Sequence, residues 1–286
     1  MYKHVSGTLH FLLLVIFLGT CASSVYLFNN EAGVTPAATF TATPLLSLPP
    51  TLDPLPDPGW SRLQPGLERR VIPIYNDQNQ HVESLHVWRL DQKYFRMDVA
   101  SDETPKSLEA WQRETNAAIV LNGGYYSMEN ERYFPNGLTI VNGHAYGRSY
   151  NGFGGMLAID DSRAELRWLV QRPYNSDEPL KAALQSFPIL VRPGGEPGYG
   201  AERESNVRAR RTVIGQDKDG RILLIVAPQG YFTLHHLSVY LTESDLDLDI
   251  AVNLDGGGST GILVANPPEI IPANRALPFV ILVYAR

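Results

Sequence analysis

Two short apolar segments end in the same way, and this repeat most constrains the fold. Ile250-Ala251-Val252 runs into Asn253-Leu254-Asp255-Gly256-Gly257-Gly258-Ser259-Thr260, and Ala118-Ile119-Val120-Leu121 runs into Asn122-Gly123-Gly124-Tyr125-Tyr126. Each apolar segment is typical of a buried strand. Glycine runs cost backbone entropy on folding, so they indicate positive φ angles or a close approach of the backbone to another group. If the two strands are parallel neighbours, both loops lie at one edge of a sheet and frame one cleft.

Asp255 and the glycines after it admit two interpretations. In the first, the segment is a ligand-binding loop in which Asp255 is the charged group and the amides from Gly256 to Ser259 donate hydrogen bonds to an anion. In the second, it is a plain glycine turn that the Asp255 side chain caps. Tyr125 and the tyrosines near it either stack on sugar rings or belong to the core.

Composition excludes some classes of protein. The chain has 286 residues, of which 44% are hydrophobic and 19% charged, as expected for a globular protein with a sizeable core. Its formal net charge of −6 provides no basic patch, so we expect no nucleic-acid partner. The only cysteine, Cys21, lies in the first apolar segment, so the rest of the chain has no disulfide and no cysteine metal site.

Residues 1–30 are expected to be a signal anchor or signal peptide. The stretch from Leu9 to Phe28 carries no formal charge and follows Lys3. A helix of about 20 apolar residues spans a bilayer, and a preceding positive charge keeps its N-terminus in the cytoplasm. We therefore expect the rest of the chain to be exported and anchored in the membrane. Leu18-Gly19-Thr20-Cys21 resembles a lipobox, so a lipoprotein is an alternative, as is cleavage near Ala22-Ser23 and secretion.

Residues 31–66 are expected to be a linker rich in proline and threonine. Pro54, Pro56 and Pro58 alternate with other residues, and proline at this density prevents helices and sheet ladders. The linker is either a semi-rigid stalk or a disordered tether.

Residues 67–286 are expected to form a single domain of the α+β class, with a mixed, largely antiparallel sheet and a few packing helices. Asn142-Gly143 is a strong hairpin signal, and Ser107 and Thr233 are suitable helix N-caps. The expected strands include Arg70–Ile74, His81–Leu90, Tyr94–Ala100 and the hairpin of Phe153–Ile159 with Ala164–Val170, and the expected helices are Ser107–Asn116, Pro179–Gln185 and Thr233–Thr242.

A positive cluster precedes one of the later strands. Arg211 leads straight into Thr212-Val213-Ile214, where a guanidinium can clamp a phosphate or carboxylate with two hydrogen bonds. Arg208 and Arg210 are expected to be solvated. His235-His236 lacks zinc-site spacing, and the alternating aspartates near residue 247 lack the glycine and glutamate of a calcium loop. No metal and no cofactor is therefore expected.

The order of these motifs resembles the phosphodiester glycosidase family. The resemblance rests on the two strand–loop motifs, Ser186-Phe187-Pro188-Ile189-Leu190, Arg211-Thr212, Gln229-Gly230 and Asn274-Arg275. It implies a hydrolase that cleaves a sugar-1-phosphodiester, such as an N-acetylglucosamine-1-phosphodiester, or a related glycosidic bond. The expected substrate is then a carbohydrate or glycosyl phosphodiester in an exported glycan, such as an exopolysaccharide.

This chemistry needs a cation for the phosphate and a carboxylate near the anomeric carbon. We predict Asp255 as the base or nucleophile and Arg211 as the phosphate clamp, and Glu202 and Glu204 are possible second carboxylates. Two other classes remain open: a non-catalytic polysaccharide-binding module of the cell surface, and a metal-dependent phosphodiesterase that uses Asp255 with His144. The predicted substrate-binding residues are Asn122, Gly123, Gly124, Tyr125, Asn253, Gly256, Gly257, Gly258, Ser259 and Thr260. Of these, Asn122 and Asn253 either bond to sugar hydroxyls or orient Asp255.

Overall fold

Antiparallel sheets dominate residues 56–150 and 152–286, which a computed structural model describes. The expected membrane segment at 1–30 and most of the expected linker lie outside these residues. The linker range nevertheless contains strand β1, Ser61–Gln64, which pairs with β2, Leu67–Tyr75. Within the described part of the chain, no helix has both the length and the apolar character needed to cross a membrane.

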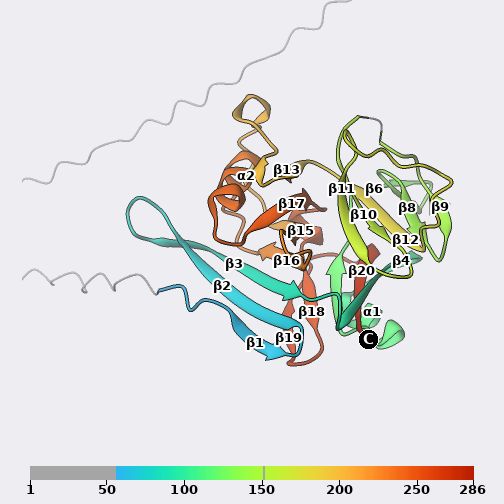
Figure 1. Cartoon of the computed structure of the whole chain (residues 1–286), viewed down its shortest axis with the longest axis horizontal. Coiled ribbons are helices and arrows are strands. Elements are labelled where there is room, and N and C mark those ends of the chain that lie inside the picture. Colours follow the sequence, from blue (N-terminus) through green and yellow to red (C-terminus); the bar gives the residue numbers. More distant parts are fainter. Residues whose placement is uncertain (1–55, 151) are drawn as a thin grey trace, which may run out of the picture. The chain divides into compact units, whose positions relative to one another are not determined.

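The largest sheet has eight strands in the order β1-β2-β3-β16-β15-β17-β13-β14. The long hairpin of β2 and β3 lies at the lower left of Figure 1. β17 lies between β15 and β13, and Asn253 at its end is opposite Val213. The other strands of this sheet are β3 His81–Leu90, β13 Ile189–Arg192, β14 Glu196–Pro197, β15 Arg211–Asp217, β16 Ile222–Ala227 and β17 Leu248–Asn253.

Two five-stranded sheets and a ribbon complete the β-structure of the described residues. One sheet has the order β11-β10-β12-β8-β9, with β8 Thr139–Val141, β9 His144–Tyr146, β10 Gly155–Ile159, β11 Ala164–Trp168 and β12 Ala182–Ser186. The other has the order β19-β18-β5-β20-β4, with β4 Phe95–Lys106, β5 Ile119–Asn122, β18 Ile262–Val264, β19 Glu269–Ile271 and β20 Leu277–Ala285. The ribbon pairs β6 Tyr126–Glu129 with β7 Arg132–Pro135.

The three large sheets share one hydrophobic core, to which Trp88, Leu121 and Leu157 each contribute from a different sheet. β5 is buried on both faces, because Leu121 points into this core while Val120 packs in the cluster beside helix α1, Leu108–Thr115. A strand that is covered on both sides needs apolar residues at successive positions. This explains why the segment before Asn122 is a continuous apolar run.

Both α-helices of the described residues begin where their capping residues predict. Ser107 accepts a hydrogen bond from the Ala110 N–H at the start of α1, and Thr233 accepts one from the His236 N–H at the start of α2, Leu234–Glu243. Helix α2 lies beside β13 of the large sheet (Figure 1). Its Leu237 belongs to the same hydrophobic cluster as Leu190 and Val191 of β13. These two helices are few beside the strands, so the fold is richer in sheet than a balanced α+β fold.

Two expectations about secondary structure are wrong. The stretch expected to be a helix, Pro179–Gln185, contains strand β12, which pairs with β10 on one side and β8 on the other. Its residues are buried in a sheet interior, so tertiary pairing overrides their helical propensity. In addition, β5 and β17 are not parallel neighbours, because they belong to different antiparallel sheets.

An ion pair joins β2 of the large sheet to β19. Arg69 of β2 donates to Glu269 at 2.6 and 3.0 Å, and its guanidinium lies 4.0 Å from the centre of the Trp88 ring. Burial opposes ionisation of Glu269, but hydrogen bonds from His86 and Arg69 together with the Arg69 charge lower its pKa to about 2. The pair therefore stabilises the contact between the sheets while Glu269 is ionised.

We predict that Glu269→Gln lowers the free energy of unfolding at pH 7 by about 1 kcal/mol, the upper end for a partly exposed pair. The folded pKa lies below the ordinary value of 4.5, so the contribution is complete above pH 4.5 and disappears as the pH falls toward 2. Urea unfolding from pH 3 to 7 measures the difference, with exposed Glu129→Gln as the control. A difference that persists unchanged at the lowest pH would contradict this assignment.

Candidate active site

The two glycine loops meet, although their strands belong to different sheets. The Asn122 side-chain amide donates to the Asp255 carbonyl at 2.8 Å, and the Asp255 N–H donates to the Gly123 carbonyl at 3.2 Å. The expectation that the two loops lie together is therefore confirmed, but not for the expected reason. Antiparallel strands of two sheets bring their ends together here.

Asn122 uses its whole side chain to hold this junction. It is fully buried, and its Oδ1 accepts hydrogen bonds from the Thr212 hydroxyl at 2.7 Å and the Gly261 N–H at 3.1 Å. Its Nδ2 donates to the carbonyls of Gly123 and Asp255. No hydrogen-bonding capacity is left for a sugar hydroxyl, so Asn122 positions the backbone of Asp255.

Asn253 positions Tyr125. Its buried Nδ2 lies 2.7 Å from the Tyr125 hydroxyl, 2.7 Å from the Leu254 carbonyl and 3.2 Å from the Phe187 carbonyl. The Tyr125 ring packs against the Phe187 ring with centres 4.8 Å apart. The Asn253 Oδ1 has no hydrogen-bond partner among the described residues. The Tyr125 side chain is thus held at its hydroxyl by Asn253 and at its ring by Phe187.

Asp255 is a partly buried carboxylate on this loop. Burial raises its pKa, while the Ser259 hydroxyl, the Gly256 N–H and the Arg275 charge oppose the rise. The Gly256 N–H donates to Asp255 Oδ1 at 2.9 Å. A raised pKa makes the carboxylate a stronger base than an exposed aspartate, as acid–base chemistry near neutral pH requires.

The expectation that the loop amides bind an anion is wrong for three of them, because they already have acceptors. The Gly256 N–H bonds to Asp255, the Gly257 N–H to the Arg210 carbonyl at 2.8 Å, and the Ser259 N–H to the Gly256 carbonyl at 3.1 Å. The short turn of Gly257–Ser259 that results leads into the fully buried Thr260. The loop is thus a rigid support for Asp255.

The glycines are needed where the backbone approaches other groups. A Cβ on Gly256 would lie 2.8 Å from the Arg210 carbonyl oxygen, and Gly257 has a φ of +58°. On the first loop, a Cβ on Gly123 would lie 2.9 Å from the Phe279 oxygen, and one on Gly124 would lie 3.0 Å from the Gln185 oxygen. A Cβ on Gly258 would meet the Arg275 side chain at 2.7 Å. Close packing therefore explains most of the glycines in both loops.

Arg211 places a cation beside Tyr125. It begins β15, is 7% exposed, and donates to the Phe232 carbonyl at 3.1 Å and the Val207 carbonyl at 2.7 Å. Burial lowers its pKa, although an arginine stays protonated at neutral pH. Burial and the Asp255 charge raise the pKa of Tyr125, and the Arg211 charge lowers it. Asp255 and Arg211 therefore both lie within electrostatic range of the Tyr125 phenol.

Neither predicted second carboxylate has a contact with Asp255 in the described structure. Glu202 is exposed and pairs with Arg203 at 3.5 Å. Glu204 accepts hydrogen bonds from the His235 N–H at 3.0 Å and the Asn206 N–H at 2.7 Å. Burial opposes its ionisation, but these bonds and one with Thr233 lower the pKa of Glu204. Glu204 therefore caps the start of α2.

Glu83 is a buried acid that is not among the residues predicted from the sequence. It is fully buried and accepts hydrogen bonds from the Gln229 N–H at 3.0 Å and the Tyr231 N–H at 3.2 Å. The sequence did indicate this burial, because the alternation of side chains along a strand places Glu83 on the same face of β3 as the apolar residues Leu85 and Val87. Glu83 therefore supports the Gln229–Tyr231 turn.

Arg210 connects this region to the Asp255 loop. It was expected to be solvated, but it is half-buried, and its Nη2 donates to the Pro272 carbonyl at 2.8 Å. Burial lowers its pKa, and the charge of Glu83 opposes this. Arg208 is exposed as expected, with its guanidinium 4.7 Å from the Tyr231 ring centre. His144 is also exposed, on β9, where it contacts the Asn142 carbonyl.

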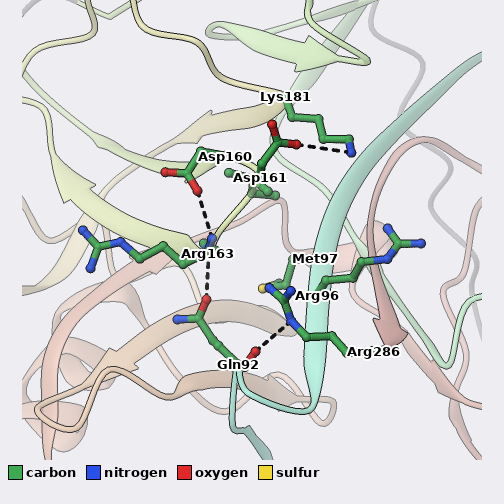
Figure 2. A pocket seen from close by; sticks show the side chains of 10 residues that line it. Gln92, Arg96, Met97, Asp160, Asp161, Arg163, Lys181 and Arg286 are labelled. Atoms are coloured by element: carbon green, nitrogen blue, oxygen red, sulfur yellow. Dashed lines mark hydrogen bonds and ion pairs between the residues drawn. The ribbon is translucent and has the colours of Figure 1, made fainter.

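A cavity of ≈ 390 Å³ borders Tyr125 through the ring of Phe187. Its other lining residues include Phe153, Trp168, Tyr199, Arg192 and Arg203. A separate cavity of ≈ 50 Å³ lies at the β10–β11 turn, where Arg286 bonds to the Gln92 carbonyl and Lys181 approaches Asp161 (Figure 2). None of the predicted site residues lines either cavity. The larger cavity adjoins the site through Phe187, whose ring packs on Tyr125.

No group of three or more histidine, cysteine, aspartate or glutamate side chains within residues 56–150 and 152–286 is arranged to hold a metal ion.

The fold and the site together define a β-rich protein with an acidic and a basic group around one loop. The model of the phosphodiester glycosidase family matches residues 115–284. The chain therefore belongs to the phosphodiester glycosidase family, which is a family of hydrolases. No curated protein matches the chain.

Three solved structures share the fold. Their sequence identities to this chain are low, so the similarity shows the fold alone. One is the zebrafish N-acetylglucosamine-1-phosphodiester alpha-N-acetylglucosaminidase catalytic domain, auto-inhibited by its pro-peptide, with a TM-score of 0.62, 19% identity, and coverage of 78% of this chain and 85% of that chain. A hypothetical protein from Synechocystis has a TM-score of 0.56 and 12% identity, and the match covers 82% of this chain and 64% of that chain. An exported-protein candidate from Burkholderia pseudomallei has a TM-score of 0.52 and 13% identity, and the match covers 71% of this chain and 74% of that chain.

We predict that Asn122→Ala lowers the free energy of unfolding by about 3 kcal/mol, because it leaves several buried donors and acceptors without partners. Thr212→Val, which removes a single hydrogen bond to Asn122 Oδ1, is expected to lower it by about 1 kcal/mol. Chemical unfolding of both variants measures the two losses. The role of Asn122 as a crosslink is contradicted if its loss is no larger than that of Thr212→Val.

Proposed function

We propose that the protein hydrolyses a sugar-1-phosphodiester, or a related glycosidic bond, in an exported glycan. The observation that carries this proposal is that Asp255 and Arg211 both lie within electrostatic range of Tyr125, whose ring packs on Phe187 at the wall of a cavity. The name of the zebrafish enzyme with the same fold states that it acts on an N-acetylglucosamine-1-phosphodiester. This supports the same class of substrate here.

Arg211 would bind the phosphate of the substrate. Its guanidinium is held by two backbone carbonyls and forms no ion pair with a carboxylate among the described residues, so its charge is not neutralised inside the protein. A cation held in place before the substrate arrives stabilises the charge of the departing phosphate without reorganisation. Phosphate is already a good leaving group, so this arrangement reduces the need for a strong general acid.

Asp255 would act at the anomeric carbon in one of two ways. As a nucleophile it forms a bond to that carbon while the bond to the phosphate oxygen breaks, and water then cleaves the glycosyl-enzyme. As a base it takes a proton from the water that attacks the same carbon. The first route retains and the second inverts the anomeric configuration, so NMR of the first sugar product distinguishes them. Tyr125 would lie beside the sugar in either case.

We also propose that residues 1–30 export the domain and tether it to the membrane. The charge-free stretch after Lys3 supports this location, and a polymeric or cell-surface glycan would be accessible there. Mass spectrometry of the mature N-terminus separates an anchor, a lipoprotein and a cleaved form.

We predict that Asp255→Asn lowers kcat by at least about 10³-fold and that Arg211→Gln lowers kcat/KM by about 10²-fold, because one removes the reacting carboxylate and the other the phosphate cation. Arg208→Gln is the matched control, since Arg208 is exposed and stacks on Tyr231. The full chain is assayed on N-acetylglucosamine-1-phosphodiesters and plain aryl glycosides, with and without chelator.

Each other result of this assay favours another class of protein. Binding without turnover in every preparation, with Asp255→Asn unchanged, favours a polysaccharide-binding module. Loss of activity in chelator favours a metal-dependent phosphodiesterase.

We predict an acid limb in the pH profile of kcat/KM that lies above pH 3.8. Burial raises the folded pKa of Asp255 above this ordinary value, so the reactive carboxylate is lost at a higher pH than an exposed aspartate would be. Initial rates from pH 3 to 8 locate the limb. A limb at or below pH 3.8 would show that another group controls the rate.

A further inference from the structure

The ≈ 390 Å³ cavity beside Tyr125 combines aromatic and positively charged side chains. Phe153, Trp168 and Phe187 provide ring faces, which suit the apolar faces of sugars. Arg192 and Arg203 are its charged residues, and no carboxylate lines it. This composition contrasts with the protein as a whole, whose formal net charge is −6.

Arg192 is the more available of the two cations. It is exposed at the end of β13, has no ion pair with a carboxylate among the described residues, and lies 5.8 Å from the centre of the Trp168 ring. Arg203 pairs with Glu202 at 3.5 Å, and both of these side chains are largely exposed. An exposed pair of this kind is weak and exchanges readily with another anion.

The cavity adjoins the candidate active site through two residues of its wall. Phe187 lines the cavity and packs on Tyr125, while its carbonyl lies 3.2 Å from the Asn253 amide. Tyr199 also lines the cavity and is within electrostatic range of both Tyr125 and Arg211. The cavity therefore lies next to Tyr125, the residue proposed to lie beside the sugar.

We propose that this cavity binds a second negatively charged group of the substrate, a carboxylate or phosphate on the residue next to the scissile phosphodiester. Arg192 binds this anion with hydrogen bonds from its planar guanidinium, and Trp168 and Phe187 stack on the sugar that carries it. The inference rests on the proposed function and narrows its substrate class to acidic glycans.

The test uses three synthetic N-acetylglucosamine-1-phosphodiesters with glucose, glucuronic acid or glucose 6-phosphate as the aglycone. The full-length wild-type protein is expected to prefer the two acidic probes, mainly through a lower KM. Arg192→Gln is expected to lower the ratio of kcat/KM for acidic over neutral probes by about tenfold, and Arg192→Lys to restore part of it. Arg163→Gln is the matched control, because Arg163 is an exposed arginine that does not line this cavity.

The two acidic probes distinguish a carboxylate site from a phosphate site. The inference is overturned if the ratio for both acidic probes is unchanged in Arg192→Gln, or if Arg163→Gln lowers it equally. If no probe is hydrolysed, the proposed function fails, and calorimetry of Asp255→Asn and Asp255→Asn/Arg192→Gln decides the inference separately. Tighter binding of an acidic probe that depends on Arg192 supports it, and equal binding of all three probes overturns it.

Discussion

The side chain of Asn122 is the interaction on which the site depends. It ends a strand of one sheet and bonds to Thr212 of another sheet, to Gly261, and to the backbone of Asp255. Each of these partners is buried or partly buried, so an unpaired group would carry the full cost of desolvation. The Asn122 amide therefore couples the position of Asp255 to the relative position of the two sheets.

Rigid support of the loop explains how a carboxylate with a raised pKa is maintained. A partly buried aspartate is disfavoured in its charged form, and only a few groups oppose this: the Gly256 N–H, the Ser259 hydroxyl and the charge of Arg275. At Gly256 and Gly123 the backbone packs so closely on Arg210 and Phe279 that a side chain would not fit. The shared core of the three sheets provides the stability that such a site requires.

Charges around the site have separate roles that their sequence positions do not reveal. Arg211 is held by backbone carbonyls, whereas Arg210 contributes its own carbonyl to the Gly257 N–H. Glu204 caps a helix and Glu83 holds a turn, so two acids near the site are already fully engaged by backbone amides. Asp255 accepts a single backbone hydrogen bond on its carboxylate among the described residues, fewer than either Glu83 or Glu204.

The sequence by itself determined the local features: the strand ends at Asn122 and Asn253, the helix caps at Ser107 and Thr233, the Asn142-Gly143 hairpin and the family. These follow from apolar runs, capping side chains and turn residues, which act over a few positions. Only the tertiary structure decided that the Ala182–Ser186 segment is a strand, that the two loops meet across separate antiparallel sheets, and that Asn122 holds the loop and does not face a ligand. Strand pairing and hydrogen bonds between residues more than 100 positions apart depend on the whole packed core, which no local pattern specifies.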